Sequence, residues 1–287
     1  MKYFLPILII ILLLFAGCDK PEELPSFVHI EKFTLTDNPL LEEGSLTEKI
    51  EYAHVYIGKE NLGVVRLPIT LPVLTNGEND VKIDPVVKKN GIAATLGVYP
   101  FFKRYRTTIH LTKSKTDTLH PVTSYIDDAV IHLQEDFESN GNAFVVKLIQ
   151  GEPSLRNTST SSFEGKSGII SFSKENFIAG FLTSEDDLFS LTNGKKIWVE
   201  LDFKTTTSVL FGIIGHQGND VQERLSFGVN PNEDWEKIYF DFTDDVIETH
   251  SADGYQFMIK SGLPVDGENF TSDTATVLLD NIKLISF

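Results

Sequence analysis

Seven histidines and 41 acidic side chains are the residues of this 287-residue chain that could support acid–base or metal chemistry. The histidines do not form an HExxH pair or another close metal-ligand spacing, and no GxSxG nucleophile elbow or glycine-rich phosphate loop is present. A glycosidase needs two suitably spaced carboxylates, and sequence alone does not select such a pair among so many acids. The missing motifs therefore favour a protein that is not an enzyme.

Aromatic and polar side chains alternate with apolar ones along several short segments of the second half of the chain. Trp198 and Glu200 share one strand face, whereas Ile197 and Val199 share the other. Exposed aromatics that are bracketed by planar polar groups are typical of sugar recognition. The predicted glycan-binding residues are Trp198, Glu200, Asp202, Arg224, Tyr239, Asp241 and Gln256. The alternative is a central strand of a two-layered sandwich that buries both of its faces.

A basic and aromatic run in the first half of the chain is a candidate protein contact. Its residues are Phe101, Phe102, Lys103, Arg104 and Arg106. Aromatic side chains beside arginine are enriched at protein interfaces. The alternative is a strand end with solvated charges.

The N-terminus has the layout of a secretory signal. Lys2 precedes a 12-residue apolar run, Phe4 to Phe15, which is too short to span a bilayer. The segment Phe15-Ala16-Gly17-Cys18, with the only cysteine of the chain, resembles a lipobox. The resemblance implies cleavage of residues 1–17 and acylation of Cys18, which anchors the protein to a membrane. An ordinary cleaved signal and an uncleaved anchor are the alternatives.

Residues 18–24 are an acidic, proline-containing segment that predicts an extended tether. Lys20, Glu22 and Glu23 are similar to the acidic export signals of Bacteroidota surface lipoproteins. This resemblance implies an outer-membrane protein, lipid-anchored and exposed at the cell surface. A plain polar linker is the alternative.

Charge divides the remaining chain into two parts. Residues 25–133 contain 12 basic and 13 acidic side chains, whereas residues 134–287 contain 11 and 25. This asymmetry predicts a domain boundary near 133. The overall charge of −16 argues against a nucleic-acid partner, because phosphate binding needs a basic surface.

Short runs of β-branched and aromatic residues, separated by turn residues, predict an all-β protein of two β-sandwich domains. In residues 25–133, Ala53, Val55 and Ile57 alternate with polar neighbours, and Asn76-Gly77 and Asn90-Gly91 are turn signals. The run VYIGKENLG and the later LPVLTNGENDVKI resemble Ig-like or transthyretin-like modules of surface lipoproteins. The resemblance implies a fold and no chemistry.

Residues 134–287 alternate more regularly. Strand faces are predicted at Ile197 to Phe203, Leu225 to Val229, Ile238 to Phe242 and Tyr255 to Ile259. The motifs Glu135-Asp136-Phe137-Glu138, Trp235 to Phe242 and Leu279-Asp280-Asn281-Ile282 resemble the jelly roll of carbohydrate-binding modules and galactose-binding-like domains.

The jelly-roll resemblance also implies a structural calcium ion between the first and last strands. The matching residues are Asp136, Glu138 and Asp280, and calcium prefers such oxygen ligands. The alternative is a bend at Asp280 and a solvated Glu138. No other cofactor is expected.

Asp117-Thr118-Leu119 and Asp273-Thr274-Ala275 fit the short motif that Bacteroidota use for O-glycosylation. Thr118 and Thr274 are therefore predicted modification sites in exposed loops.

Two functional hypotheses follow. The first is a non-catalytic outer-membrane lipoprotein that acts as an accessory or scaffold subunit of a protein assembly, with an outer-membrane protein as partner. The alternative is a surface glycan-binding lipoprotein of a polysaccharide-uptake system.

Overall fold

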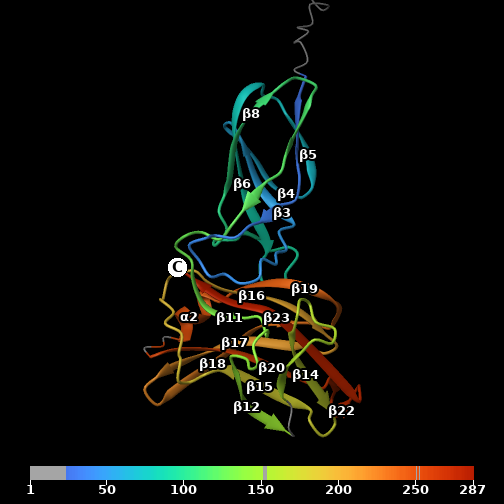
Figure 1. The fold of residues 1–287 in the computed structure, drawn as a ribbon, viewed down its shortest axis with the longest axis vertical. Helices are drawn as coiled ribbons and strands as arrows, with labels where there is room; N and C mark the ends of the chain where they lie inside the picture. The colour runs from blue at the N-terminus through green and yellow to red at the C-terminus, as the bar shows by residue number, and fades with distance from the viewer. Residues whose placement is uncertain (1–23, 151–153, 250, 252) are drawn as a thin grey trace, which may run out of the picture.

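The computed structural model describes residues 24–150, 154–249, 251 and 253–287 (Figure 1). Regular structure in this part of the chain is almost entirely β-strand, with a short helix α2 (Thr243–Thr249). None of its helices is long and apolar enough to cross a bilayer. The predicted all-β class is confirmed, whereas the predicted signal at 1–17 and Cys18 lie outside the described residues.

The first domain is a β-sandwich. Its strands are β1 (Ser26–Ile30), β2 (Thr34–Leu35), β3 (Tyr52–Ile57), β4 (Glu60–Arg66), β5 (Ile69–Val73), β6 (Gly77–Lys88), β7 (Leu96–Val98), β8 (Tyr105–Leu111), β9 (Thr116–Leu119) and β10 (Val122–Thr123). One layer contains the sheet β5-β1-β9 and the small parallel pair β10-β2. The other layer has the order β4-β3-β6-β7, with β8 also paired to β6.

Local sequence explains these elements. Ala53, Val55 and Ile57 are fully buried, because the two-residue period of β3 turns them toward the core. The connection Gly58–Lys59 closes the predicted hairpin between β3 and β4. Asn90 and Gly91 have φ angles of 58° and 71°, which is the left-handed region that their residue types tolerate.

The second domain packs two larger sheets face to face. Its strands are β11 (Val130–Glu135), β12 (Phe144–Gln150), β13 (Leu155–Thr158), β14 (Ser167–Ser173), β15 (Ile178–Thr183), β16 (Ile197–Thr205), β17 (Val209–Gln217), β18 (Asp220–Val229), β19 (Asn232–Asp241), β20 (Gly254–Gly262), β21 (Val265–Asp266), β22 (Asn269–Phe270) and β23 (Thr274–Ser286). The first sheet has the order β13-β14-β23-β16-β19, with β11 also paired to β23. The second has the order β12-β15-β20-β17-β18.

The core of the second domain lies between these sheets and has the predicted apolar faces. Val199 and Phe240 from the first sheet meet Phe211, Phe257 and Ile259 from the second. Each of these five side chains is fully buried. They belong to one apolar cluster between the sheets, whose burial stabilises the domain.

One detail of the sequence prediction is wrong, and the domain boundary can be placed more closely. Leu225 does not share a face with Phe227, because the pairing with β17 shifts between Phe211 and Gly212 and leaves Ser226 as an extra residue. Leu225 instead packs with Ile214 on the opposite side of the sheet. The predicted boundary at 133 falls inside β11, which pairs with β23 of the second domain. The second domain therefore begins a few residues earlier.

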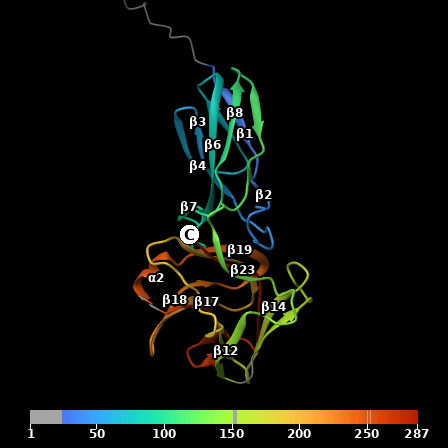
Figure 2. The same cartoon turned by 60° about the vertical axis from the view of Figure 1, so that its left-hand side comes forward.

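The two domains lie end to end (Figures 1 and 2). The sheet that contains β16, β19 and β23 is the layer next to the first domain, and the sheet that contains β17, β18 and β20 lies beyond it. The described chain begins at the far end of the first domain, whereas its C-terminus lies at the junction.

Candidate functional site

The predicted glycan-binding face on β16 and β19 is buried. Trp198, Glu200, Asp202, Tyr239 and Asp241 are between 0% and 8% exposed. Their strand face is opposite to the core of the second domain, as alternation predicts, but it is covered by the first domain. The prediction of an exposed platform is therefore wrong at these positions.

Arg224 and Gln256 do not join this face, because β18 and β20 belong to the other sheet. Gln256 is fully buried and its amide donates to the carbonyl of Thr183, while its Oε1 lies 2.8 Å from His216 Nε2. Arg224 pairs with Asp245 and Glu248 on α2. The seven predicted residues are thus divided between two sheets and do not make one site.

Glu200 is the centre of a buried polar network between the domains. The hydroxyl of Tyr99 donates to Glu200 Oε2 over 3.1 Å, and that of Tyr125 donates to Oε1. The ammonium groups of Lys283 and Lys237 lie 3.6 and 3.9 Å from Oε1. Burial opposes ionisation of Glu200, but the two ammonium groups and two hydroxyls outweigh it and lower its pKa. Glu200 is therefore a buried carboxylate anion.

A loop of the first domain, residues 44–49, lies across this polar face. The carbonyl of Ser45 accepts from Lys283 Nζ over 2.7 Å. The hydroxyl of Thr47 donates to Asp202 Oδ2 over 2.7 Å and accepts from Lys237 Nζ over 2.8 Å. The 44–49 loop thus satisfies polar groups that the second domain alone would leave to solvent.

Aromatic side chains complete the contact between the domains. The ring of Tyr99 lies 5.3 Å from that of Trp198 and 5.0 Å from that of Tyr239. Phe101 packs against the C-terminal Phe287, with ring centroids 4.9 Å apart. These residues belong to one hydrophobic cluster that contains side chains from both domains. The junction is therefore packed like a core.

The predicted protein-contact run is also corrected. Phe101 and Phe102 are 0% and 5% exposed and contribute to the junction, so they are not available to an external partner. Lys103 pairs with Asp127, and Arg104 forms two hydrogen bonds of 2.5 and 2.7 Å with Asp84. Arg106 on β8 is exposed, as predicted for a contact residue.

The structure does not bring the predicted calcium ligands together. Within the described ranges, no three His, Cys, Asp or Glu side chains are grouped so that they could hold a metal ion. Asp136 accepts from the backbone N–H of Glu138, and Glu138 accepts from that of Lys166. Asp280 instead accepts from Ser167 and Asn281, and burial raises its pKa to about 6. This ligand set is therefore wrong.

Thr118 and Thr274 are exposed, as modification would require, but they lie in strands β9 and β23 and not in loops. Their O-glycosylation stays a prediction.

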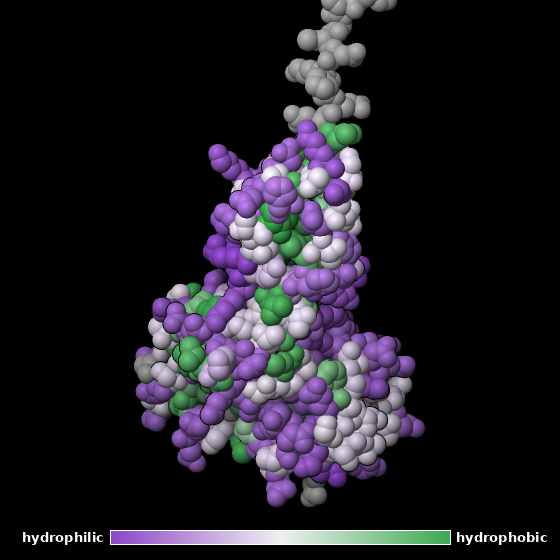
Figure 3. Space-filling view, turned by 45° about the horizontal axis from the view of Figure 1, so that its top comes forward, coloured by the Kyte–Doolittle hydropathy of each residue, from purple (hydrophilic) through white to green (hydrophobic). Residues whose placement is uncertain are grey.

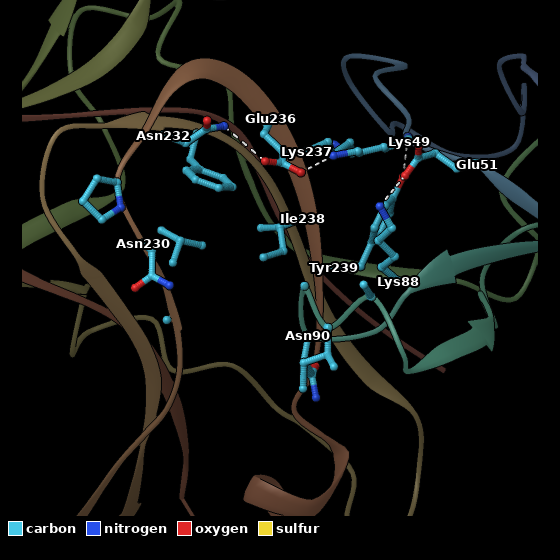
Figure 4. Close-up of a pocket in the computed structure, with 17 residues that line it drawn as sticks. Lys49, Glu51, Lys88, Asn90, Asn230, Asn232, Glu236, Lys237, Ile238 and Tyr239 are labelled. Carbon is cyan, nitrogen blue, oxygen red and sulfur yellow. Dashed lines mark hydrogen bonds and ion pairs between the residues drawn. The ribbon is translucent and has the colours of Figure 1, made fainter.

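A cleft of about 500 Å³ lies beside the network, at the boundary of the two domains. Figure 4 shows Asn230 and Asn232 on one side of Ile238, and Lys49, Glu51 and Lys88 on the other. The turn that contains Asn90 and Gly91 closes one end. A methyl group on Gly91 would lie 2.8 Å from Ile238 Cδ1, so the glycine allows this turn to approach β19 closely.

The charges that line the cleft are paired. Lys88 Nζ lies 2.7 Å from Glu51 Oε2, and this hydrogen bond lowers the pKa of Glu51 and raises that of Lys88. Lys49 pairs with Glu236, and Asn232 donates to the same carboxylate over 3.1 Å. The cleft therefore offers amide, carboxylate and ammonium groups in fixed positions with little net charge.

Sequence reasoning missed this cleft. The Asn90-Gly91 turn was predicted, but Asn230-Pro231-Asn232 lies 140 residues later and belongs to the other domain. A pattern along the chain indicates neither that these turns meet nor that Lys88 faces Glu51.

Comparisons with known proteins identify similar folds. No family model and no curated protein matches the chain. The CBM22-1 xylan-binding domain from Paenibacillus barcinonensis is 15% identical, covers 55% of this chain and 95% of its own length, and has a TM-score of 0.40. A carbohydrate-binding module of the β-sandwich superfamily is 14% identical, covers 81% of this chain and 84% of its own, and also has a TM-score of 0.40.

The family 11 carbohydrate-binding module from Clostridium thermocellum is 16% identical, covers 54% of this chain and 94% of its own, and has a TM-score of 0.38. The solved structures similar to this chain thus include carbohydrate-binding β-sandwich modules. At such identities and TM-scores, the similarity does not assign a ligand or an activity.

Proposed function

We infer that this chain is a non-catalytic glycan-binding lipoprotein whose binding site is the cleft between its two domains. The observation that carries this proposal is the lining of the cleft. Its amides and carboxylates come from both domains, and the packed junction holds them in place. This function replaces the predicted platform around Trp198, which is buried.

The chemistry of the cleft suits a neutral oligosaccharide. An asparagine amide both donates and accepts, so it can bind adjacent sugar hydroxyls. Asn230 is exposed at the cleft and makes no hydrogen bond among the described residues, so its amide is available to a ligand. In each of the ion pairs Lys49–Glu236 and Lys88–Glu51, the two charges cancel. This favours a neutral ligand over a charged one.

In this proposal, Cys18 is acylated and residues 18–24 tether the protein to the outer membrane, where it faces the cell surface. Support comes from the sequence, in which the only cysteine directly follows a short apolar run. The tether joins the first domain at one end, and the cleft lies at the other end. An acyl anchor at Cys18 would therefore hold the cleft away from the membrane.

An accessory subunit of an outer-membrane assembly is a second candidate function. It is favoured by three exposed apolar residues on β7 and the turn before it: Ile92, Leu96 and Val98 are 52%, 37% and 44% exposed. Strand β7 lies at an edge of its sheet, and an apolar edge strand can pair with a partner.

Glycan binding is tested with a panel of neutral and acidic oligosaccharides, followed by titration calorimetry of any oligosaccharide that binds. Asn230→Ala should weaken binding by roughly tenfold, which corresponds to the loss of about one hydrogen bond to a ligand. Asn193→Ala is the matched control, because Asn193 is exposed in the same domain and does not line the cleft.

Equal affinities of Asn230→Ala and wild type would contradict the cleft as the site. Absence of binding to the whole panel, together with recovery of a stoichiometric outer-membrane protein from native membranes, would favour the accessory-subunit function. In that case Val98→Glu should weaken the association.

A further inference from the structure

The end of the first domain that lies farthest from the second domain carries a small amphiphilic surface (Figures 1 and 2). We call Leu24, Leu74, Lys113 and Lys115 the N-terminal tip. Leu24 and Leu74 are 55% and 60% exposed, and both lysines are exposed. Figure 3 shows apolar surface beside the point where the described chain meets the grey residues.

The tip is held by the ends of three neighbouring strands. Ser26 at the start of β1 is paired with Val73 at the end of β5, so Leu24 and Leu74 lie near each other. On the other side of β1, the N–H of Ser114 donates to the carbonyl of Pro25 over 2.8 Å, and the N–H of Phe27 donates to that of Lys115 over 2.9 Å. These bonds hold the loop that carries Lys113 and Lys115 beside Leu24 and Leu74.

The length of the tether limits how far this surface can lie from a membrane. Five residues lie between Cys18 and Leu24, so six residue-to-residue steps join them. Fully extended, they span about 20 Å, at roughly 3.3–3.6 Å per residue. If Cys18 is acylated, as the proposed function requires, the tip stays within this distance of the lipid headgroups.

We propose that the N-terminal tip lies on the phospholipid surface, with Leu24 and Leu74 inserted among the headgroups and Lys113 and Lys115 directed at lipid phosphates. Leucine side chains gain from leaving water, and lysines beside them reach the headgroup level. Carboxylates of the neighbouring strands also lie near this end: Glu60, Glu78 and Asp80 line one hollow with Thr75, and Asp117 follows Lys115 on β9. The contact fixes the orientation of the anchored protein and keeps its cleft away from the membrane.

The chain has a single cysteine, so an acylated Cys18 leaves no free thiol. Leu74→Cys therefore provides a unique labelling site on an exposed side chain. The full-length lipidated variant is labelled with an environment-sensitive fluorophore and reconstituted into phosphatidylethanolamine vesicles that contain nitroxide-labelled phosphatidylcholine. Leu210→Cys is the matched control, because Leu210 is an exposed leucine of the second domain, 43% accessible.

The label at position 74 should be quenched several-fold more strongly by the nitroxide lipid than the label at position 210. Equal quenching of acylated, vesicle-bound protein would overturn this inference and leave the anchor intact. Mass spectrometry of the intact protein detects the acyl chains, and Cys18→Ser should release the protein from membranes. An unacylated Cys18 would overturn both the anchor and the inference.

Discussion

The two faces of the sheet that contains β16, β19 and β23 are both buried, but by different chemistry. The inner face is covered by the second sheet and consists of residues such as Val199, Phe240 and Leu284. The outer face is covered by the first domain and includes Glu200 and Lys237. The polar face of this sheet therefore marks a junction between domains and not a surface.

The two faces differ in how they tolerate the loss of one group. An apolar side chain contributes through the area that it removes from water, so its loss leaves a cavity of limited cost. A buried charge depends on its partner, and removal of that partner leaves an uncompensated ion. The following variants compare these two behaviours.

The largest effect is expected on the inner face. Phe240→Ala should lower the free energy of unfolding by about 4 kcal/mol, because Phe240 is fully buried among Phe211, Phe227 and Phe242. Urea unfolding monitored by circular dichroism measures the change. Val221→Ala is the control, since Val221 is 51% exposed and its truncation should change stability little. A similar loss for both variants would contradict the assignment of this core.

On the outer face, Glu200→Leu should cost about 3 kcal/mol, because it leaves Lys237 and Lys283 buried without their shared carboxylate. Adding Lys237→Met and Lys283→Met should recover part of this stability, since a buried charge cluster can be replaced by packed apolar side chains. A triple variant that is less stable than Glu200→Leu would show that the ammonium groups do not depend on Glu200.

Asp280 should give a pH dependence at the edge of the same face. Burial raises its folded pKa to about 6 from an ordinary value of 3.8. Between these values the folded state holds more protons than the unfolded state, so this group makes the protein less stable as the pH rises from about 4 to about 6. The raised pKa stabilises the folded protein at acidic pH. This stabilisation is at most about 3 kcal/mol, and it is lost above pH 6.

Asp280→Asn should remove this dependence. The stability of the variant relative to wild type should therefore increase as the pH rises from about 4 to about 6. Urea unfolding at several pH values measures the free energy of unfolding of both proteins. A difference that is independent of pH would contradict the raised pKa.

The smallest effect is expected where charges pair at the surface. Arg224→Ala removes contacts of 3.3 Å with Asp245 and 2.5 Å with Glu248, but the arginine side chain is 39% exposed, and the buried Asp245 keeps its hydrogen bond from Ser226. Because water screens such pairs, the loss should be about 0.5 kcal/mol in the same unfolding measurement. A loss comparable to that of Glu200→Leu would remove the distinction between a buried network and a surface pair.

Particular residues show what sequence could predict. The two-residue period placed Val199, Phe240 and Phe257 in the core, because alternation is a property of a single strand. The same period placed Trp198 and Glu200 on the opposite face correctly, but it carries no information about what covers that face. The 44–49 loop, which contacts Asp202, has no regular structure and no pattern, and the tyrosines that contact Glu200, Tyr99 and Tyr125, lie 101 and 75 residues away in sequence.

The candidate site was beyond sequence reasoning for a related reason. Asn90 and Asn230 line the same cleft only because the domains pack through Tyr99, Trp198 and Tyr239. A single inserted residue, Ser226, likewise changed the face of Leu225, and strand pairing alone reveals it.

Tryptophan fluorescence tests the central claim, that the polar face lies inside the two-domain unit, most directly. The chain has two tryptophans, so Trp235→Phe leaves Trp198 as the only tryptophan, and excitation at the red edge of the absorption band avoids the tyrosines. Trp198 is 3% exposed in a cluster with Tyr99, and its emission should be blue-shifted and resistant to quenching by iodide and acrylamide. Red-shifted emission that both quenchers reduce readily would mean that Trp198 lies on an open surface, and would contradict the account.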